Sequence, residues 1–133
     1  MKRIFLAAII CILAAVTVGA RTNPGEKVGV TFDKIVYDFG TVKESGANVK
    51  HEFVMTVTGD APVAILQAHA SCGCTKPTYD RKPVRPGEKG IIKVSFVPKG
   101  QKGEVNKEIR LKLKSGNGKS ETVTLRITGV VTP

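Results

Sequence analysis

The sequence lacks tryptophan and has few other aromatic residues, with two tyrosines and five phenylalanines in 133 residues. A protein that binds single-stranded nucleic acid by base stacking needs a platform of such side chains. The lysines and arginines also form no run of five or more, and they are spread over every segment of the chain. The sequence therefore gives no support for a nucleic-acid partner.

Groups for acid–base catalysis are equally scarce, because the chain has only two histidines, His51 and His69. It contains neither a Gly-x-Ser-x-Gly nucleophile elbow nor a glycine-rich phosphate loop. A cysteine nucleophile with His69 as its base is the alternative, but no third group suggests itself to orient that base. His51 shares the apolar side of a predicted strand with Val49 and Phe53, which favours a hydrogen-bonded histidine in the core or at a sheet end. We expect no enzymatic activity and no cofactor.

Long apolar runs are missing except at the N-terminus. Lys2 and Arg3 precede an uncharged and almost wholly apolar stretch from Ile4 to Val18, and Val18-Gly19-Ala20 follows. This order is typical of a secretory signal peptide, and it predicts cleavage after Ala20. We therefore expect an exported protein, located in the periplasm, at the cell surface or outside the cell.

Two other readings of the N-terminus are weaker. A transmembrane anchor needs roughly 20 apolar residues, and this run is shorter and ends in a cleavage-like motif. A lipoprotein signal would attach the lipid to Cys11, but the bulky Ile9 and Ile10 precede it where a small residue is normal. We thus divide the chain into a signal peptide (1–20), a flexible leader (21–27) and one domain (28–133) that does not span the membrane.

The net charge stays strongly positive after the predicted cleavage. Loss of Lys2 and Arg3 lowers the formal net charge from +10 to +8. A solvated basic surface that aids solubility is one interpretation, and electrostatic attachment to an anionic surface is the other.

The predicted domain shows apolar residues at every second position and almost no helical period. Alternation of this kind, with one apolar and one polar side, occurs in five strand-length runs, at 28–32, 49–57, 92–96, 105–113 and 123–127. Asn117-Gly118 separates the last two runs and predicts an antiparallel hairpin over 104–131. Pro86-Gly87 suits a type II turn, because proline presets φ and glycine supplies φ > 0. Short strands with this punctuation predict an all-β, immunoglobulin-like antiparallel sandwich of about seven strands, with a barrel as the alternative.

Four elements in order carry a resemblance to a known family. They are Asp38-Phe39-Gly40, Cys72-Gly73-Cys74-Thr75, Pro86-Gly87-Glu88 and the closing Leu125-Arg126-Ile127-Thr128-Gly129. Over residues 28–131 the chain resembles the DUF1573 family of exported, immunoglobulin-like proteins, which are common in Bacteroidetes. The resemblance implies the fold and the compartment, with structural roles for Gly40, Pro86, Gly87 and Gly129, but it implies no activity. Thr58-Gly59-Asp60 departs from the family's usual Asn-x-Gly turn.

Cys72 and Cys74 allow three interpretations. A disulfide can close across Gly73, which tolerates unusual backbone angles; such a small ring stabilises the fold weakly and is easily reduced. The two thiolates could instead bind copper or zinc with His69, but an extended chain places His69 on the opposite face and no second ligand motif exists. Finally, the two cysteines could be buried in a seam of small residues together with Ala68 and Ala70.

These observations give three functional hypotheses. The first is a non-catalytic interaction module that binds another envelope protein or a surface ligand through loops or an exposed strand edge. The second is a thiol-redox or soft-metal function at Cys72 and Cys74, and the third is electrostatic attachment to an anionic surface. The sequence gives no indication of the oligomeric state.

Overall fold

The computed structural model of the protein describes residues 27–133. The predicted signal peptide and all but the last residue of the predicted leader lie outside the described residues. The described part folds into eight strands: β1 (Val30–Phe32), β2 (Val36–Lys43), β3 (Val49–Val57), β4 (Val63–Ala70), β5 (Thr75–Tyr79), β6 (Lys89–Phe96), β7 (Gly103–Ser115) and β8 (Ser120–Thr132). No helix in this part of the chain is long and apolar enough to cross a membrane.

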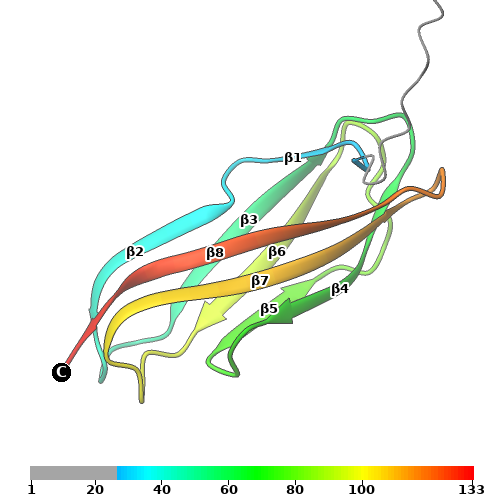
Figure 1. Ribbon diagram of the computed structural model, residues 1–133. Coiled ribbons are helices and arrows are strands. Elements are labelled where there is room, and N and C mark those ends of the chain that lie inside the picture. Colours follow the sequence, from blue (N-terminus) through cyan, green and yellow to red (C-terminus); the bar gives the residue numbers. More distant parts are fainter. Residues whose placement is uncertain (1–26) are drawn as a thin grey trace, which may run out of the picture.

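The strands form two four-stranded sheets that pack face to face (Figure 1). The strand order is β1-β3-β6-β5 in one sheet and β2-β8-β7-β4 in the other. Each strand presents one apolar side, and two sheets that stack in this way hide those sides from water. The all-β and sandwich predictions are confirmed, and the barrel alternative is wrong.

The N-terminal part of the sandwich differs from the expected purely antiparallel order. β1 pairs antiparallel with β3, whereas β2 crosses to the other sheet and pairs parallel with β8. The N-terminal segment thus forms two strands, one in each sheet, and this contributes to the total of eight strands instead of the expected seven or so. Apolar alternation marks a strand, but it carries no information on the direction of the neighbouring strand.

The β7–β8 hairpin forms where the sequence predicts it. Its register runs from Gly103 opposite Val131 to Lys114 opposite Ser120. The turn is closed by the N–H of Ser115, which donates to the carbonyl of Lys119 at 2.8 Å. Because these two strands are the longest and lie at the centre of their sheet, they form the platform on which β2 and β4 pair.

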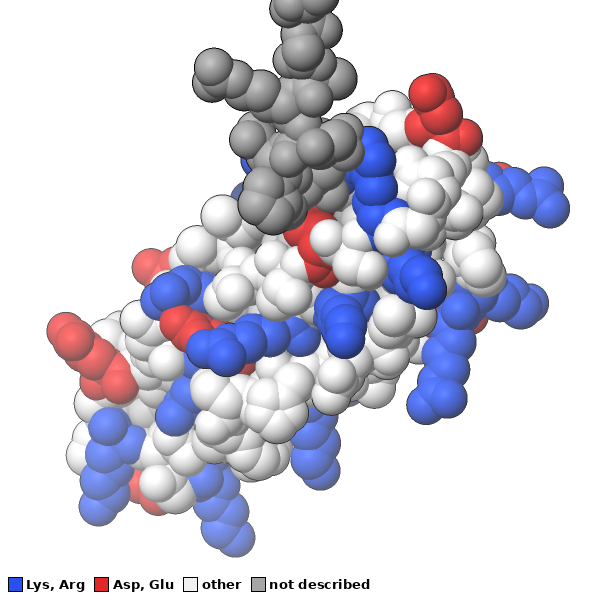
Figure 2. Space-filling model, turned by 45° about the vertical axis from the view of Figure 1, so that its right-hand side comes forward, with Lys and Arg blue, Asp and Glu red and all other residues white. Residues whose placement is uncertain are grey.

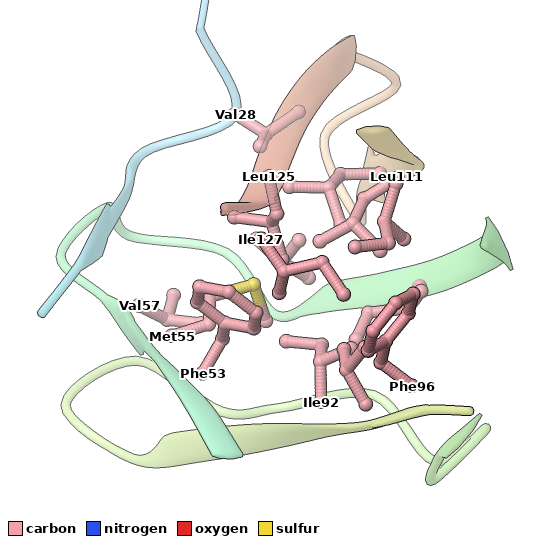
Figure 3. Packing of buried hydrophobic residues seen from close by; sticks show 14 of the residues in the cluster. Val28, Phe53, Met55, Val57, Ile92, Phe96, Leu111, Leu125 and Ile127 are labelled. Carbon is pink, nitrogen blue, oxygen red and sulfur yellow. The ribbon is translucent and has the colours of Figure 1, made fainter. Parts of the chain in front are cut away.

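The core lies between the sheets and is built from the inward side chains of both (Figure 3). Phe53, Met55, Ile92 and Phe96 come from the first sheet, and they face a layer of aliphatic residues from β7 and β8. Burial of one such side chain contributes about 1.5–3 kcal/mol to folding. The fully buried members of the facing layer are Ile109, Leu111, Leu113, Leu125, Ile127 and Val131.

Six glycines of the described residues have a positive φ that other residues rarely adopt, and two of them lie in elements that the sequence analysis singles out. Gly87 has a φ of +80° in the turn after Pro86, where the N–H of Glu88 donates to the carbonyl of Arg85 at 3.0 Å. Gly40 has a φ of +72° at an irregularity of β2, and its N–H donates to Oδ1 of Asp38 at 2.8 Å. Glycine has no Cβ, so it enters this left-handed region at little cost.

Candidate functional site

Cys72, Gly73 and Cys74 form the turn that carries the chain from β4 in one sheet to β5 in the other. The two sulfur atoms lie within disulfide-bonding distance, and the Cα atoms are 5.2 Å apart. The N–H of Cys74 points at Sγ of Cys72 at 3.1 Å, and the N–H of Thr75 donates to the carbonyl of Cys72 at 3.2 Å. The sulfur pair is therefore part of a tight, internally bonded turn.

Hydrogen bonds fasten this cysteine turn to both sheets. The N–H of Ser71 donates to the carbonyl of Glu108 on β7 at 2.9 Å, and Oγ of Ser71 accepts the N–H of Glu108 at 3.2 Å. On the other side, the carbonyl of Cys74 accepts the N–H of Val97 at 2.9 Å. Both cysteines are half-buried, and Cys74 packs against the core. The fold thus holds the pair on a fixed frame that stays partly open to solvent.

His69 does not complete a metal site with the cysteines. It is exposed on β4 and lies opposite Arg110 of β7. Within residues 27–133, no three side chains of His, Cys, Asp or Glu are placed to hold a metal ion. At this turn the structure thus brings together the two sulfur atoms of Cys72 and Cys74, without His69.

His51 enters the space between the sheets from β3. Its ring stacks on Tyr37 of β2 with centroids 3.8 Å apart, and it meets the edge of Phe53 at 4.6 Å. Nε2 is buried without a hydrogen-bond partner, so the expectation of a hydrogen-bonded histidine is wrong at this atom. β2 and β3 belong to different sheets, so the stacking partner emerges only when the sheets pack.

The surroundings of His51 also change its charge state. Burial lowers the pKa of His51, because the charged ring loses hydration, and the nearby carboxylate of Asp33 opposes this effect. The pKa of Asp33 is itself lowered, chiefly because its carboxylate accepts the N–H of Val54 at 3.0 Å. The structure therefore favours a neutral His51 beside an ionised Asp33.

A group of cations lies on the outer face of the β2-β8-β7-β4 sheet. Arg110, Lys112 and Lys114 are exposed and alternate with buried residues of β7, so all three point outward. We call these three residues the basic ladder. Figure 2 shows the molecule from the side of β7 and β8, where lysine and arginine side chains predominate.

The neighbours of the basic ladder in the sheet are neutral. Each cation lies between one residue of β4 and one of β8, in the rows His69–Arg110–Thr124, Gln67–Lys112–Thr122 and Ala64–Lys114–Ser120. The next outward residue along β7, Glu108, binds Arg126 at 2.8 Å and lies 3.8 Å from Arg110. Among the described residues, no carboxylate forms an ion pair with Lys112 or Lys114. This half of the face therefore carries uncompensated positive charge.

An apolar hollow lies beside Lys114. The pairing of β4 with β7 shifts between Ile65 and Gln67, which leaves Leu66 as the extra residue of a bulge with 52% of its surface exposed. A hollow of about 510 Å³ opens here. We call it the Leu66 hollow; Pro62, Ala64, Leu66 and Pro83 line it together with Lys114 and the start of the β7–β8 turn.

The free strand edges are poorly suited to pairing with another strand. β1 has only 3 residues, and register shifts interrupt β2 and β4. On β5, the hydrogen bond from the N–H of Val97 to the carbonyl of Cys74 shows which backbone groups point toward β6 and which point toward the free edge. The backbone nitrogen of Pro77 points toward the free edge, and because proline has no N–H, this edge lacks a hydrogen-bond donor there. Short length, bulges and proline are the usual protections of an edge. The edge-pairing mode of the interaction hypothesis thus has less structural support than a face.

Sequence reasoning missed the basic ladder as a cluster. The shared parity of Arg110, Lys112 and Lys114 within one predicted strand was a readable signal, but lysines occur in every segment and hide it. The neutral flanks depend on the register of β4 and β8, and the Leu66 hollow depends on a bulge. Neither follows from the alternation.

Comparisons with known proteins support the fold. The chain is similar to the VesB protease of Vibrio cholerae (TM-score 0.64, 15% identity, 77% of this chain and 32% of VesB). It is also similar to a PapD-like domain of human CEP192 (TM-score 0.65, 11% identity, 86% of this chain and 95% of that domain). A third match is the periplasmic chaperone SfaE (TM-score 0.60, 10% identity, 79% of this chain and 59% of SfaE). At these identities the likeness shows the fold alone, and the chain spans about a third of VesB.

No curated protein matches the chain. A match to a protein family covers residues 30–131, nearly the whole of the described sandwich, including the cysteine turn and the closing strand. The chain therefore belongs to the family described as "Protein of unknown function (DUF1573)".

Proposed function

We propose that this protein is an exported, non-catalytic interaction module that binds a protein partner through the outer face of the β2-β8-β7-β4 sheet. The observation that carries this proposal is the uncompensated charge of Lys112 and Lys114 in the basic ladder, next to the exposed Leu66 hollow. Apolar surface rimmed by polar groups is typical of binding sites. The protected strand edges leave a face as the better contact surface.

Two weaker observations support parts of this proposal, one the interaction role and the other export. SfaE, which shares the fold, is described as a periplasmic chaperone. Export itself rests on the N-terminal pattern of Lys2, Arg3 and the apolar stretch after them. N-terminal sequencing of protein recovered from the cell envelope tests export; we expect the mature chain to begin at Arg21.

Partner capture from envelope extract tests the interaction role. The wild-type protein is compared with a variant that carries Arg110→Glu, Lys112→Glu and Lys114→Glu. A matched control reverses three exposed lysines of the other sheet, with Lys50→Glu, Lys76→Glu and Lys89→Glu. We expect a specific partner that the ladder variant loses and the control keeps. Repeated failure to recover any specific partner, or equal loss in both variants, contradicts the proposal.

A second candidate function is thiol–disulfide exchange at the cysteine turn, favoured by the sulfur pair at bonding distance. In that reaction a partner dithiol loses two electrons and two protons and becomes a disulfide, while Cys72 and Cys74 become two thiols. Intact mass with and without alkylation tests it. Two unreactive free thiols in the protein as recovered, without bound metal, reject this candidate in favour of buried structural cysteines.

A further inference from the structure

The spacing of the basic ladder matches that of an extended peptide. Residues along a strand rise by about 3.3 Å, so the side chains of Arg110, Lys112 and Lys114 repeat about every 6.6 Å. An extended peptide that lies along β7 repeats its own alternate side chains at the same interval. Acidic residues at every second position can therefore meet Lys112 and Lys114, and a third can meet Arg110, which also lies 3.8 Å from Glu108.

The flanks of the ladder suit a peptide more than other polyanions. Thr122, Thr124 and Gln67 offer hydroxyl and amide groups beside the cations, and these can bond to a peptide backbone. No tryptophan, tyrosine or phenylalanine occupies the three rows of the ladder, so the large aromatic platform on which successive bases stack is absent there. The Leu66 hollow is lined mainly by apolar side chains and has a volume of about 510 Å³, which is enough space for one side chain of a bound peptide.

We propose that the basic ladder and the Leu66 hollow together bind an extended acidic segment of a partner protein, with one apolar side chain of that segment seated in the hollow. This inference rests on the proposed function and adds the chemistry of the partner. Lys114 belongs to both parts of the site, since it closes the ladder and also lines the hollow. The apolar residue of the segment is therefore expected next to its last acidic residue.

Direct binding to synthetic peptides tests this chemistry. The probe is a capped, labelled peptide with glutamates at three alternate positions followed by one leucine. One control peptide replaces the glutamates by glutamines, and another replaces the leucine by serine. We expect the probe to bind the purified protein, each control peptide to bind more weakly, and added salt to weaken probe binding, because exposed charge pairs are screened.

Protein variants locate the site. Lys112→Glu with Lys114→Glu is expected to weaken probe binding about tenfold or more, because two attractive contacts become repulsive. Lys50→Glu with Lys76→Glu is the matched control and is expected to leave binding nearly unchanged. Leu66→Ser should weaken the leucine probe and have little effect on the serine peptide. All altered side chains are exposed, and a thermal melt of each variant shows that it remains folded.

Several outcomes overturn the inference. Equal probe binding to the wild-type protein and the ladder variant does so. The inference also fails if the wild-type protein does not bind the probe but binds phosphatidylglycerol vesicles, and the ladder variant does not bind these vesicles. That result assigns the face to membrane binding. If the ladder variant loses its captured partner but no acidic peptide binds, the interaction face is supported and the peptide chemistry is wrong. If neither capture nor probe binding depends on the ladder, both proposals fail.

Discussion

The ring of Phe39 lies over Gly129 at the position that a side chain of residue 129 would need. A Cβ at Gly129 would overlap Cδ2, Cε2 and Cζ of the Phe39 ring. Phe39 sits at the irregularity of β2 opposite Gly129 of β8, and its ring stacks on Phe96 of the other sheet at 5.3 Å. The absence of a side chain at residue 129 thus lets an edge strand contribute an aromatic ring to the inter-sheet packing.

Gly129→Ala is expected to destabilise the fold by about 1–3 kcal/mol, because an added methyl group in a packed site forces its neighbours to move. For a domain of about 100 residues, each kcal/mol lowers Tm by about 4–8 °C. Chemical denaturation and thermal melts measure the effect. Gly116→Ala is the control, since the nearest atom to its new Cβ, Cδ of Pro62, lies at an ordinary 3.4 Å.

The cause of this penalty is also testable. If the Phe39 ring is responsible, Gly129→Ala costs clearly less in a Phe39→Ala background, and the two substitutions are non-additive. An equal cost in both backgrounds contradicts the assignment to Phe39.

His51 should make stability fall on mild acidification. Burial lowers its pKa in the folded state below the ordinary value of 6.5, so the unfolded chain binds more protons in that range. The neutral ring's contribution is fully present above pH 6.5 and is lost as pH falls from there through the lowered pKa. Denaturation midpoints between pH 8 and pH 5 measure the slope, and His51→Phe should flatten it while keeping the stack on Tyr37.

Asp33 should affect the pH dependence of stability in a different pH range from His51. Its carboxylate has a lowered pKa, so its contribution is present above the ordinary value of 3.8 and is lost at lower pH. Asp33→Asn should therefore change stability most below that pH and leave much of the slope near pH 6. A slope near pH 6 that persists unchanged in His51→Phe would show that other groups cause it.

Reduction of the Cys72–Cys74 pair should leave the sandwich folded. The ring encloses a single intervening residue, so the loss of unfolded-state entropy is small and its removal should cost at most about 2 kcal/mol. Melts of the wild-type protein with and without a phosphine reductant test this, and Cys72→Ser with Cys74→Ser should not respond to the reductant. Loss of cooperative unfolding on reduction would show that the pair is a main support of the fold.

Pro77→Val should increase self-association. Pro77 faces the free edge of β5, and replacement by valine restores a backbone donor there and raises the tendency to pair with another strand. Sedimentation velocity over a range of concentrations measures the change. Pro83→Val is a comparison outside the strands, and no association is expected from it. If Pro77→Val stays as dispersed as the wild-type protein, the bulges and short strands alone protect the edges.

Much of the fold could be predicted from short stretches of sequence that indicate a strand or a turn by themselves. The alternation of Ile109, Leu111 and Leu113 with charged residues predicts a two-sided strand wherever that strand pairs, and Asn117-Gly118 predicts the following turn. The unusual position of Cys72 and Cys74 could be seen in the same way. Their sulfur pair was one of three readings, because spacing alone does not distinguish a bonded pair from buried thiols or metal ligands.

By itself the sequence determined the strand-length runs and the central hairpin, together with the marks of a sandwich. These follow from the burial of every second side chain and from turn residues a few positions apart. Tertiary structure alone decided the parallel β2–β8 pairing, the stack of His51 on Tyr37, the Leu66 hollow and the neutral flanks of the basic ladder. Each of these depends on which strands become neighbours and in which register, and side-chain periodicity within one strand does not contain that information.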